Sequence, residues 1–423
     1  MVIDMKTNLS LNVWKLGNWL LIACILWSPI AGIFDLMAFF RGITTSQTLA
    51  GDAAAATRII RDLLIALFYV YFVVYFILRG QVKLKVNGSS LVVVAIGLLS
   101  AATIIASVLY TITNIDVPIS VIIIGLKAFL YVPLFVAGGL FLQQYPFSLE
   151  GIRKAIIFVL VAELLIGLAE IIFMPKLFGV TVLGVGVIPT GTFAHYTIYA
   201  SFLCIFIFGH CFVNNFHLPR AILVSTLIMT FISNSRTGLG IMAFLILVWL
   251  IKDYFQKVTL RGATVALLPF LVILGLWLLP SLVGGESRRL AAEEGIAANP
   301  RWQIWENYYS RDLTFAEMAL GSGVGLASNA VSVVFGIDSF PGQFIPDSLH
   351  LAMAAQYGVL GLFFFYLFMA TLLLEFYGTI TLIVLGMILF TGFFYNVMEV
   401  YPTNLLLPVI LALHSRFGRG KKW

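Results

Sequence analysis

Stretches of about 20 apolar residues, the length that spans a bilayer as a helix, recur along this chain from beginning to end. A helix satisfies its own backbone hydrogen bonds where no water is present, so it can cross the hydrocarbon core. Composition agrees, because 61% of the 423 residues are hydrophobic and only 10% are charged. A soluble domain carries about 25% charged residues. The sequence therefore predicts an all-α polytopic integral membrane protein.

Charged residues divide the apolar stretches into twelve predicted transmembrane helices. These lie at residues 16–38, 59–78, 91–111, 119–142, 154–174, 193–213, 218–234, 236–252, 263–282, 347–373, 376–396 and 399–414. With the N-terminus inside, fifteen Lys and Arg fall on the inner side and five on the outer side, leaving out the one long loop. Because Lys and Arg favour the cytoplasmic side, we expect both termini in the cytoplasm.

The predicted topology divides the chain into three parts. Residues 1–282 hold helices one to nine, residues 283–346 form a large outer loop, and residues 347–423 hold helices ten to twelve and a tail. The loop carries much of the charge of the chain, including Arg288 and Arg289. We expect an amphipathic helix from about Glu286 to Tyr309, followed by a turn-rich part that begins with the GSGVG segment at 321–325.

Charge and cysteine content exclude several functions. The net charge of +6 does not indicate nucleic-acid binding, because the Lys and Arg stand singly at the ends of apolar segments. Cys24, Cys204 and Cys211 lie within apolar segments, and their spacing fits neither a disulfide framework nor a metal site. We expect no nucleic-acid partner, no metal and no cofactor.

Arg236 lies in the SNSRTG segment, residues 233–238, where a predicted transmembrane helix begins on the outer side. One interpretation is an interfacial anchor whose guanidinium reaches the lipid headgroups. The other is an anion site, because small hydrogen-bonding residues, a helix N-terminus and a guanidinium all favour phosphate. The residues leave both interpretations open.

A second arginine, Arg301, lies beside Trp302 and Trp305 in the PRWQIW segment of the outer loop. It is either a solvated surface residue or part of a phosphate clamp. Indoles beside a guanidinium fit an interfacial aromatic belt or a surface on which sugars stack.

Asp347 and His350 lie at the predicted outer end of helix ten, in the segment PDSLHLAMAAQYGVLG at 346–361. Residues three apart on a helix share a face, so the two side chains form a candidate acid and base pair. The alternative is that Asp347 serves only as the N-cap of the helix.

Further acids lie in or near predicted spans at Glu163, Glu170 and Glu399. Glu163 and Glu170 are two helical turns apart on one face, and an acid within a span is a functional candidate by default. Pairing with Lys127 or Lys176 is the structural alternative. The glycine-rich outer loop at 175–192 is a candidate for returning into the membrane.

Taken together, SNSRTG, PRWQIW with the downstream GSGVG, and the segment 346–361 resemble the O-antigen polymerase and ligase superfamily, of the Wzy and WaaL type. That resemblance implies about twelve helices with one large periplasmic loop, a polyprenyl-diphosphate-linked oligosaccharide as substrate, and location in the bacterial inner membrane. It assigns the diphosphate to Arg236 and Arg301, with Arg288 and Arg289 as further candidates. It also points to a chain-length regulator and a flippase as partners.

The resemblance favours a polymerase over a ligase. Ligases typically carry H-N-x-x-L with a Gly eleven residues after the His. Counting back from Gly358 places Asp347 at the His position and Ser348 at the Asn position, while His350 is out of register. We therefore expect Asp347 to act as the base, with His350 as the second catalytic candidate and Glu170 and Glu399 as additional acids.

Two other functions stay open. A ligase that attaches glycan to lipid A core is the nearest alternative. From another class, a twelve-helix secondary transporter or flippase fits the composition, although transporters bind their substrates near the membrane midplane and not at an outer loop.

Overall fold

The structure is a computed structural model, and every regular element in its described residues is a helix, which agrees with the predicted all-α fold. It describes residues 16–34, 49–79, 88–126, 149–173, 189, 191–193, 196–213, 216–233, 235–255, 300–328, 331, 335, 339–344, 346, 348–377, 380–393 and 403–415.

Helices occupy the predicted apolar segments wherever the structure describes them. Long apolar helices able to cross a membrane lie at Leu16–Phe34, Leu91–Asn114, Glu150–Ile172 and Leu349–Glu375. Shorter apolar helices lie at Tyr196–Phe212, Arg220–Ile232, Thr237–Leu250, Ile380–Gly392 and Thr403–Leu413. The predicted helical membrane protein is thereby confirmed. The number of twelve spans and the place of the large loop stay predictions, because 263–282 and 283–299 lie outside the described residues.

The chain forms two compact units that alternate along the sequence. The first contains Met1–Val86, Leu134–Gly238 and Tyr401–Lys422, and the second contains Asn87–Pro133 and Leu239–Val400. This division follows packing and leaves the predicted three-part topology untested.

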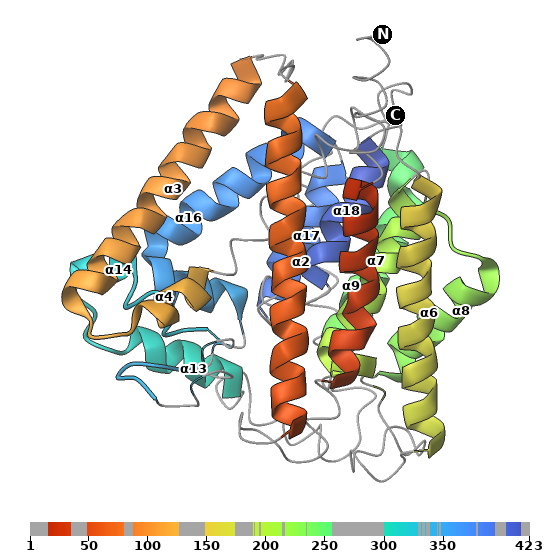
Figure 1. The fold of residues 1–423 in the computed structure, drawn as a ribbon, viewed down its shortest axis with the longest axis horizontal. Coiled ribbons are helices and arrows are strands. Elements are labelled where there is room, and N and C mark those ends of the chain that lie inside the picture. The colour runs from red at the N-terminus through yellow and green to blue at the C-terminus, as the bar shows by residue number, and fades with distance from the viewer. Residues whose placement is uncertain are drawn as a thin grey trace. The chain divides into compact units, whose positions relative to one another are not determined.

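The first unit is built around one helix that is buried over most of its length. Its elements are α2 (Leu49–Arg79), α6 (Leu149–Phe173), the 3-10 turn η2 (Gly191–Phe193), α7 (Tyr196–Phe212), α8 (Arg220–Ile232), the first turn of α9 (Arg236–Phe255) and α18 (Thr403–Ser415), besides the helix Leu16–Phe34. The central helix is α7, which packs against α8, α18 and η2 (Figure 1).

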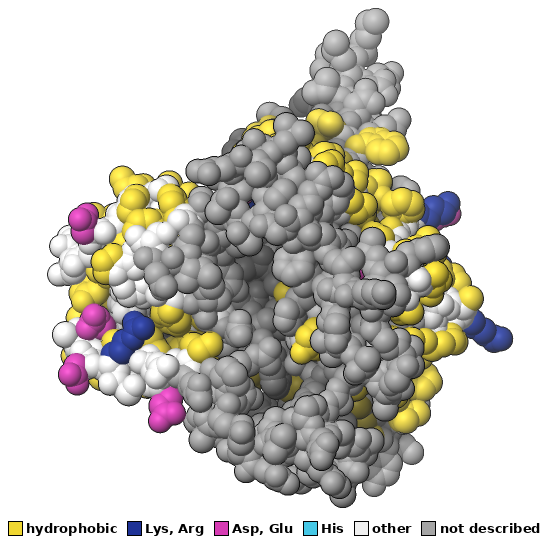
Figure 2. Space-filling model, turned by 90° about the horizontal axis from the view of Figure 1, so that it is seen from below, with side chains coloured by type: hydrophobic (Ala, Val, Ile, Leu, Met, Phe, Trp, Pro, Cys, Tyr) yellow, Lys and Arg dark blue, Asp and Glu magenta, His cyan; other side chains and the backbone are white. Residues whose placement is uncertain are grey.

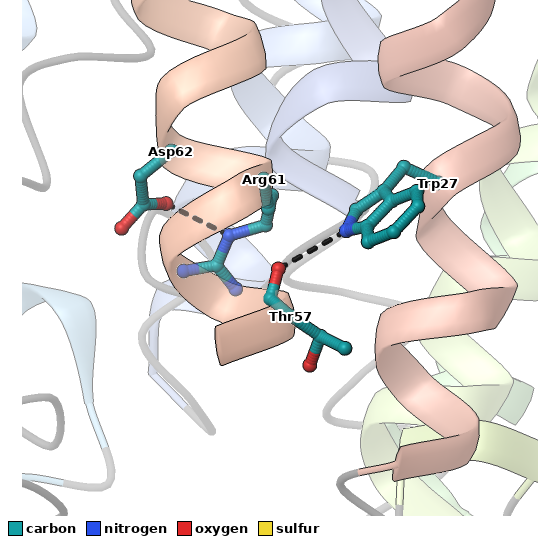
Figure 3. A network of polar contacts seen from close by, with 4 residues as sticks. All are labelled: Trp27, Thr57, Arg61 and Asp62. Atoms are coloured by element: carbon teal, nitrogen blue, oxygen red, sulfur yellow. Dashed lines mark hydrogen bonds and ion pairs between the residues drawn. The ribbon is translucent and has the colours of Figure 1, made fainter. Parts of the chain in front are cut away.

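A hydrogen bond joins the helix Leu16–Phe34 to α2. The indole N–H of Trp27 donates to the backbone carbonyl of Thr57 at 3.0 Å (Figure 3). One turn further along α2, Arg61 Nε donates to Asp62 Oδ1 at 2.8 Å. Arg61, which the positive-residue count places outside, thus has an acidic neighbour on its own helix.

The second unit contains the segments that carry the family resemblance downstream of Arg236. Its elements are α3 (Gly88–Asn114), α4 (Ile119–Leu126), the rest of α9, α13 (Pro300–Tyr309), α14 (Phe315–Leu320), α16 (Leu349–Tyr377) and α17 (Ile380–Gly392). The most extensive helix packing in this unit is between α16 and α3, and α14 packs on both (Figure 1).

Gly358 interrupts α16. Its φ of 68° is a conformation that side chains disfavour, and a Cβ there would lie 2.1 Å from the carbonyl oxygen of Ala319. Only glycine allows α14 and α16 to approach so closely. The interruption separates a short first part of α16, residues 349–357, from a longer second part, residues 359–377.

Candidate functional site

The GSGVG segment packs beneath the first part of α16. Ser322 N–H donates to the carbonyl of Ala355 at 2.8 Å, and Gly325 N–H donates to Gln356 Oε1 at 2.9 Å. The amide of Gln356 in turn donates to the carbonyl of Ala327 at 2.9 Å. The predicted turn-rich loop is confirmed over 321–328, and its hydrogen bonds hold the first part of α16 in place.

The same segment also packs against α3 and α4. Val324 N–H donates to Thr111 Oγ1 at 3.0 Å. Gly325 adopts a φ of 93°, and a Cβ there would lie 2.3 Å from the carbonyl oxygen of Val121. Tyr357 completes the packing, since its hydroxyl donates to the carbonyl of Gly125 at 3.0 Å. The glycines therefore allow three helices to meet at one loop.

Ser348 is the N-cap of α16. Its carbonyl accepts from Ala352 N–H at 2.9 Å, and its hydroxyl oxygen accepts from Leu351 N–H at 3.3 Å. The hydroxyl also donates to the carbonyl of Gly392 at 2.8 Å, which fixes the start of α16 to the end of α17. These bonds place the described N-cap of α16 at Ser348. Asp347 lies outside the described residues, and its role as base stays a prediction.

His350 is buried one turn into α16, with both ring nitrogens hydrogen-bonded to protein groups. Nε2 lies 2.8 Å from the carbonyl oxygen of Leu389, which can only accept, so Nε2 carries the proton. Nδ1 then accepts from the hydroxyl of Tyr366 at 2.6 Å. The ring also contacts Phe393 edge to face at 4.3 Å. These contacts favour a positioning role for His350 over proton transfer.

Trp305 connects α13 to the start of α16. Its ring stacks on Phe393, with centroids 6.3 Å apart and planes at 26°. Phe393 in turn contacts His350. Arg301 lies one helical turn before Trp305 on α13, although the side chain of Arg301 is not among those described. The fold thus brings the PRWQIW segment and the start of α16 into one region, a placement that the sequence alone did not establish.

Tyr308 anchors α13 in this region. It forms a buried cluster with Ala327, Leu351 and Ala355, against which Trp305 and other partly buried side chains pack. Burial raises the pKa of the Tyr308 phenol above its ordinary value, so the phenol stays protonated near neutral pH. The expected helix from about Glu286 to Tyr309 is described only from Pro300 onward.

The SNSRTG segment forms the connection from α8 to α9, and α9 begins at Arg236 as predicted. Ser235 Oγ accepts from Gly238 N–H at 3.1 Å, as an N-cap does, and the hydroxyl of Ser233 donates to the carbonyl of Thr230 at 2.7 Å. A Cβ on Gly238 would lie 2.3 Å from the Cβ of Ala200 on α7. The buried serines therefore fix the start of α9. The side chain of Arg236 is not among those that the structure describes.

Glu163 and Glu170 hold the turn η2 against α6. Glu163 Oε2 accepts from Thr192 N–H at 3.0 Å, and Oε1 accepts from the Thr192 hydroxyl at 2.6 Å. Glu170 Oε2 accepts from Gly191 N–H at 2.9 Å. Both acids are buried and lie within the apolar helix Glu150–Ile172, so the end of the 175–192 loop packs beside a candidate span.

The other predicted partners and site residues cannot be placed. Lys127 and Lys176, the alternative partners of the two acids, lie outside the described residues, as do Arg288, Arg289 and Glu399. Thr192 was not singled out in the sequence, where its only signal is its place in a glycine-rich loop beside two acids.

Comparison with known proteins finds similarity to one family over about a third of the chain. Residues 221–366 match the family described as O-antigen ligase. No curated protein and no solved structure matches the chain. The matched range contains SNSRTG, PRWQIW, GSGVG and the start of α16, and it ends at Tyr366, the hydrogen-bond partner of His350. The matched family implies a glycosyltransferase-like enzyme of polysaccharide biosynthesis, and the similarity over residues 221–366 supports a relation to the O-antigen polymerase and ligase superfamily.

Proposed function

We propose that the protein is a polysaccharide polymerase of the bacterial inner membrane. It transfers a growing chain from its polyprenyl diphosphate onto a new lipid-linked repeat unit, at the periplasmic face. The observation that carries the proposal is the packing of α13, through Trp305 and Phe393, against the start of α16. That packing brings the helix of Arg301 to the helix start that Asp347 precedes.

The reaction requires the chemistry that these residues offer. The oxygen of an acceptor hydroxyl attacks the anomeric carbon, the bond from that carbon to the diphosphate oxygen breaks, and the bonding pair leaves with the diphosphate. Arg301 and Arg236 stabilise the negative charge that grows on the diphosphate. Asp347 accepts the proton of the attacking hydroxyl. His350, through its bonds to Tyr366 and Leu389, holds the first turn of α16 in place.

A ligase is the second candidate, and the description of the matched family favours it. The replacement of the ligase His-Asn pair by Asp347 and Ser348 favours the polymerase. Ser348 bonds through its hydroxyl to the end of α17.

Deletion of the gene separates the two enzymes. A polymerase deletion leaves surface glycan with a single repeat unit, whereas a ligase deletion removes attached glycan altogether; both are visible on a gel of surface polysaccharide. Complementation with Arg301→Ala should leave the deletion pattern unchanged. Arg220→Ala is the matched control, because Arg220 is an exposed arginine at the start of another apolar helix, and it should restore the wild-type ladder. A normal ladder from Arg301→Ala would contradict the proposed role.

The proposed location has its own test. With both termini in the cytoplasm, a reporter fused after Trp423 should be active only as a cytoplasmic reporter. A reporter inserted in residues 283–299 should be active only in the periplasm. The reverse pattern would place the proposed site on the wrong side of the membrane for a periplasmic polymerase.

A further inference from the structure

Three aromatic rings form a continuous stack beside the start of α16. Trp305 lies between the other two, with its plane at 29° to Tyr309 and 26° to Phe393, and with centroid distances of 6.1 and 6.3 Å. Tyr309 is 49% exposed and Phe393 is 46% exposed, while Trp305 is partly buried. The stack therefore has a partly buried middle ring and two outer rings with exposed surface.

The surroundings of the stack fit a sugar site. Between Ile304 and Asp312, the exposed side chains other than Tyr309 are polar: Glu306, Asn307, Ser310, Arg311 and Asp312. Exposed apolar side chains follow on α14 at Phe315 and Met318. A ring in the hydrocarbon core would be flanked by apolar side chains, whereas both a headgroup-level aromatic belt and a sugar site have polar neighbours. A pyranose ring instead places its C–H face on an aromatic ring and its hydroxyls on nearby polar groups, the usual composition of a small-molecule site. Figure 2 shows hydrophobic, acidic and basic side chains next to one another on the side where α13 and α14 lie.

The position of the stack matches the place where the glycan must lie. One end of the stack, Phe393, contacts His350 and directly follows Gly392, to which Ser348 is bonded. The middle ring lies one helical turn after Arg301 on α13. A sugar on these rings is therefore close to both elements that the proposed reaction uses.

We propose that Tyr309, Trp305 and Phe393 form a binding subsite for sugar rings of the lipid-linked glycan. The inference rests on the proposed function for the choice of substrate, but the subsite itself is tested by binding alone. For Trp305, the proposal chooses glycan stacking over an interfacial aromatic belt, and the binding experiment separates the two.

The probe is the lipid-free oligosaccharide released by mild acid from the surface polysaccharide of the source cells, titrated into the purified full chain in detergent by calorimetry. Tyr309→Leu and Phe393→Leu each keep an apolar side chain but remove the ring, and each should weaken the Kd at least 10-fold. Tyr309→Phe and Phe393→Tyr should restore binding to within about 3-fold of wild type. Phe315→Leu is the control, because Phe315 is an 83% exposed aromatic ring on α14 for which no stacking partner appears among the described residues.

Each outcome is decisive. Unchanged Kd in both leucine variants, or no binding of the oligosaccharide to the wild-type protein, overturns the subsite. Equal loss in Phe315→Leu overturns it as well, because the effect would then follow from lost aromatic surface in general. Normal binding in Arg301→Ala together with a normal ladder would leave the subsite standing while the proposed reaction fails. Weakened binding in the leucine variants, with loss of product in Arg301→Ala, supports both.

Discussion

The turn η2 on α6 and the start of α16 both bury polar groups among apolar helices, but they differ in the exposure of the side chains around those groups. In the first unit, both oxygens of Glu163 accept hydrogen bonds from Thr192, and the acid, its partner and the turn are all buried. In the second unit, buried Ser348 and His350 bond to α17 and Tyr366, while the rings beside them are half exposed. Burial of a polar group thus accompanies structure in both regions, and in the second region half-exposed aromatic rings lie beside the buried groups, where we propose that a sugar binds.

The difference matters for the interpretation of acids within spans. A backbone N–H in the hydrocarbon region costs several kcal/mol if it has no partner. The acids of α6 satisfy the N–H groups of Gly191 and Thr192, which lets an irregular turn pack beside a span. This structural role explains why Glu163 and Glu170 lie on one helix face, without requiring that either acid take part in catalysis.

The largest expected effect lies at Arg236. If it binds the diphosphate, Arg236→Ala should lower the rate of chain extension about 100- to 1000-fold, because a group that stabilises the charge of the leaving group is lost. Arg236→Lys should restore only part of that rate, since one ammonium cannot replace the two-pronged guanidinium. The measurement is turnover of a lipid-linked repeat unit by purified protein. A rate within 3-fold of wild type in Arg236→Ala would leave the interfacial anchor as its role.

The second largest effect is expected at Asp347. As the base, Asp347→Asn should lower the rate about 100-fold or more with little change in stability, since the near-isosteric amide cannot take the proton. Ser348→Ala is the matched control, because it removes the N-cap and should cost about 1 kcal/mol of stability while product still forms. Normal long polymer from Asp347→Asn, with none from His350→Ala, would move the base to His350.

Substitutions at Glu163 test the structural role of the buried acids at η2. Glu163→Ala should lower stability by about 2 kcal/mol, because Thr192 N–H and hydroxyl lose their acceptor in a buried place. Glu163→Gln keeps an acceptor for the N–H and a partner for the hydroxyl, so its melting temperature in detergent should stay near that of wild type. If Glu163→Gln folds normally but abolishes turnover, Glu163 has a chemical role in addition to its structural role at η2.

Tyr366 gives the smallest expected effect. Tyr366→Phe removes the hydroxyl that donates to His350 Nδ1 and should cost about 1 kcal/mol of stability. If His350 only positions the helix, the rate should change less than about 3-fold and its pH profile should keep its shape. A pH profile displaced in Tyr366→Phe would show that the imidazole exchanges protons during turnover.

Sequence reasoning predicted the elements better than the contacts between them. The apolar segments predicted helices, and SNSRTG predicted the start of α9 at Arg236, because helix length and helix capping depend on neighbouring residues. The stacking of Trp305 on Phe393 could not be predicted, since it joins residues far apart in the sequence. The cap of α16 at Ser348 could not be predicted either, because aspartate and serine both cap helices and only the backbone geometry shows where the helix begins.

The interruption of α16 at Gly358 has a consequence for the response of the protein to its membrane. Spanning helices adjust to a thicker or thinner bilayer chiefly by changing their tilt. An unbroken helix would pass that change of tilt to its first turn. In α16, residues 349–357 are held by the GSGVG segment and α17, and the hydrogen bond from Tyr366 to His350 links them to residues 359–377. We expect the non-helical Gly358 to bend and absorb a change of tilt in residues 359–377 before that bond breaks. Turnover in vesicles should therefore vary little with acyl chain length.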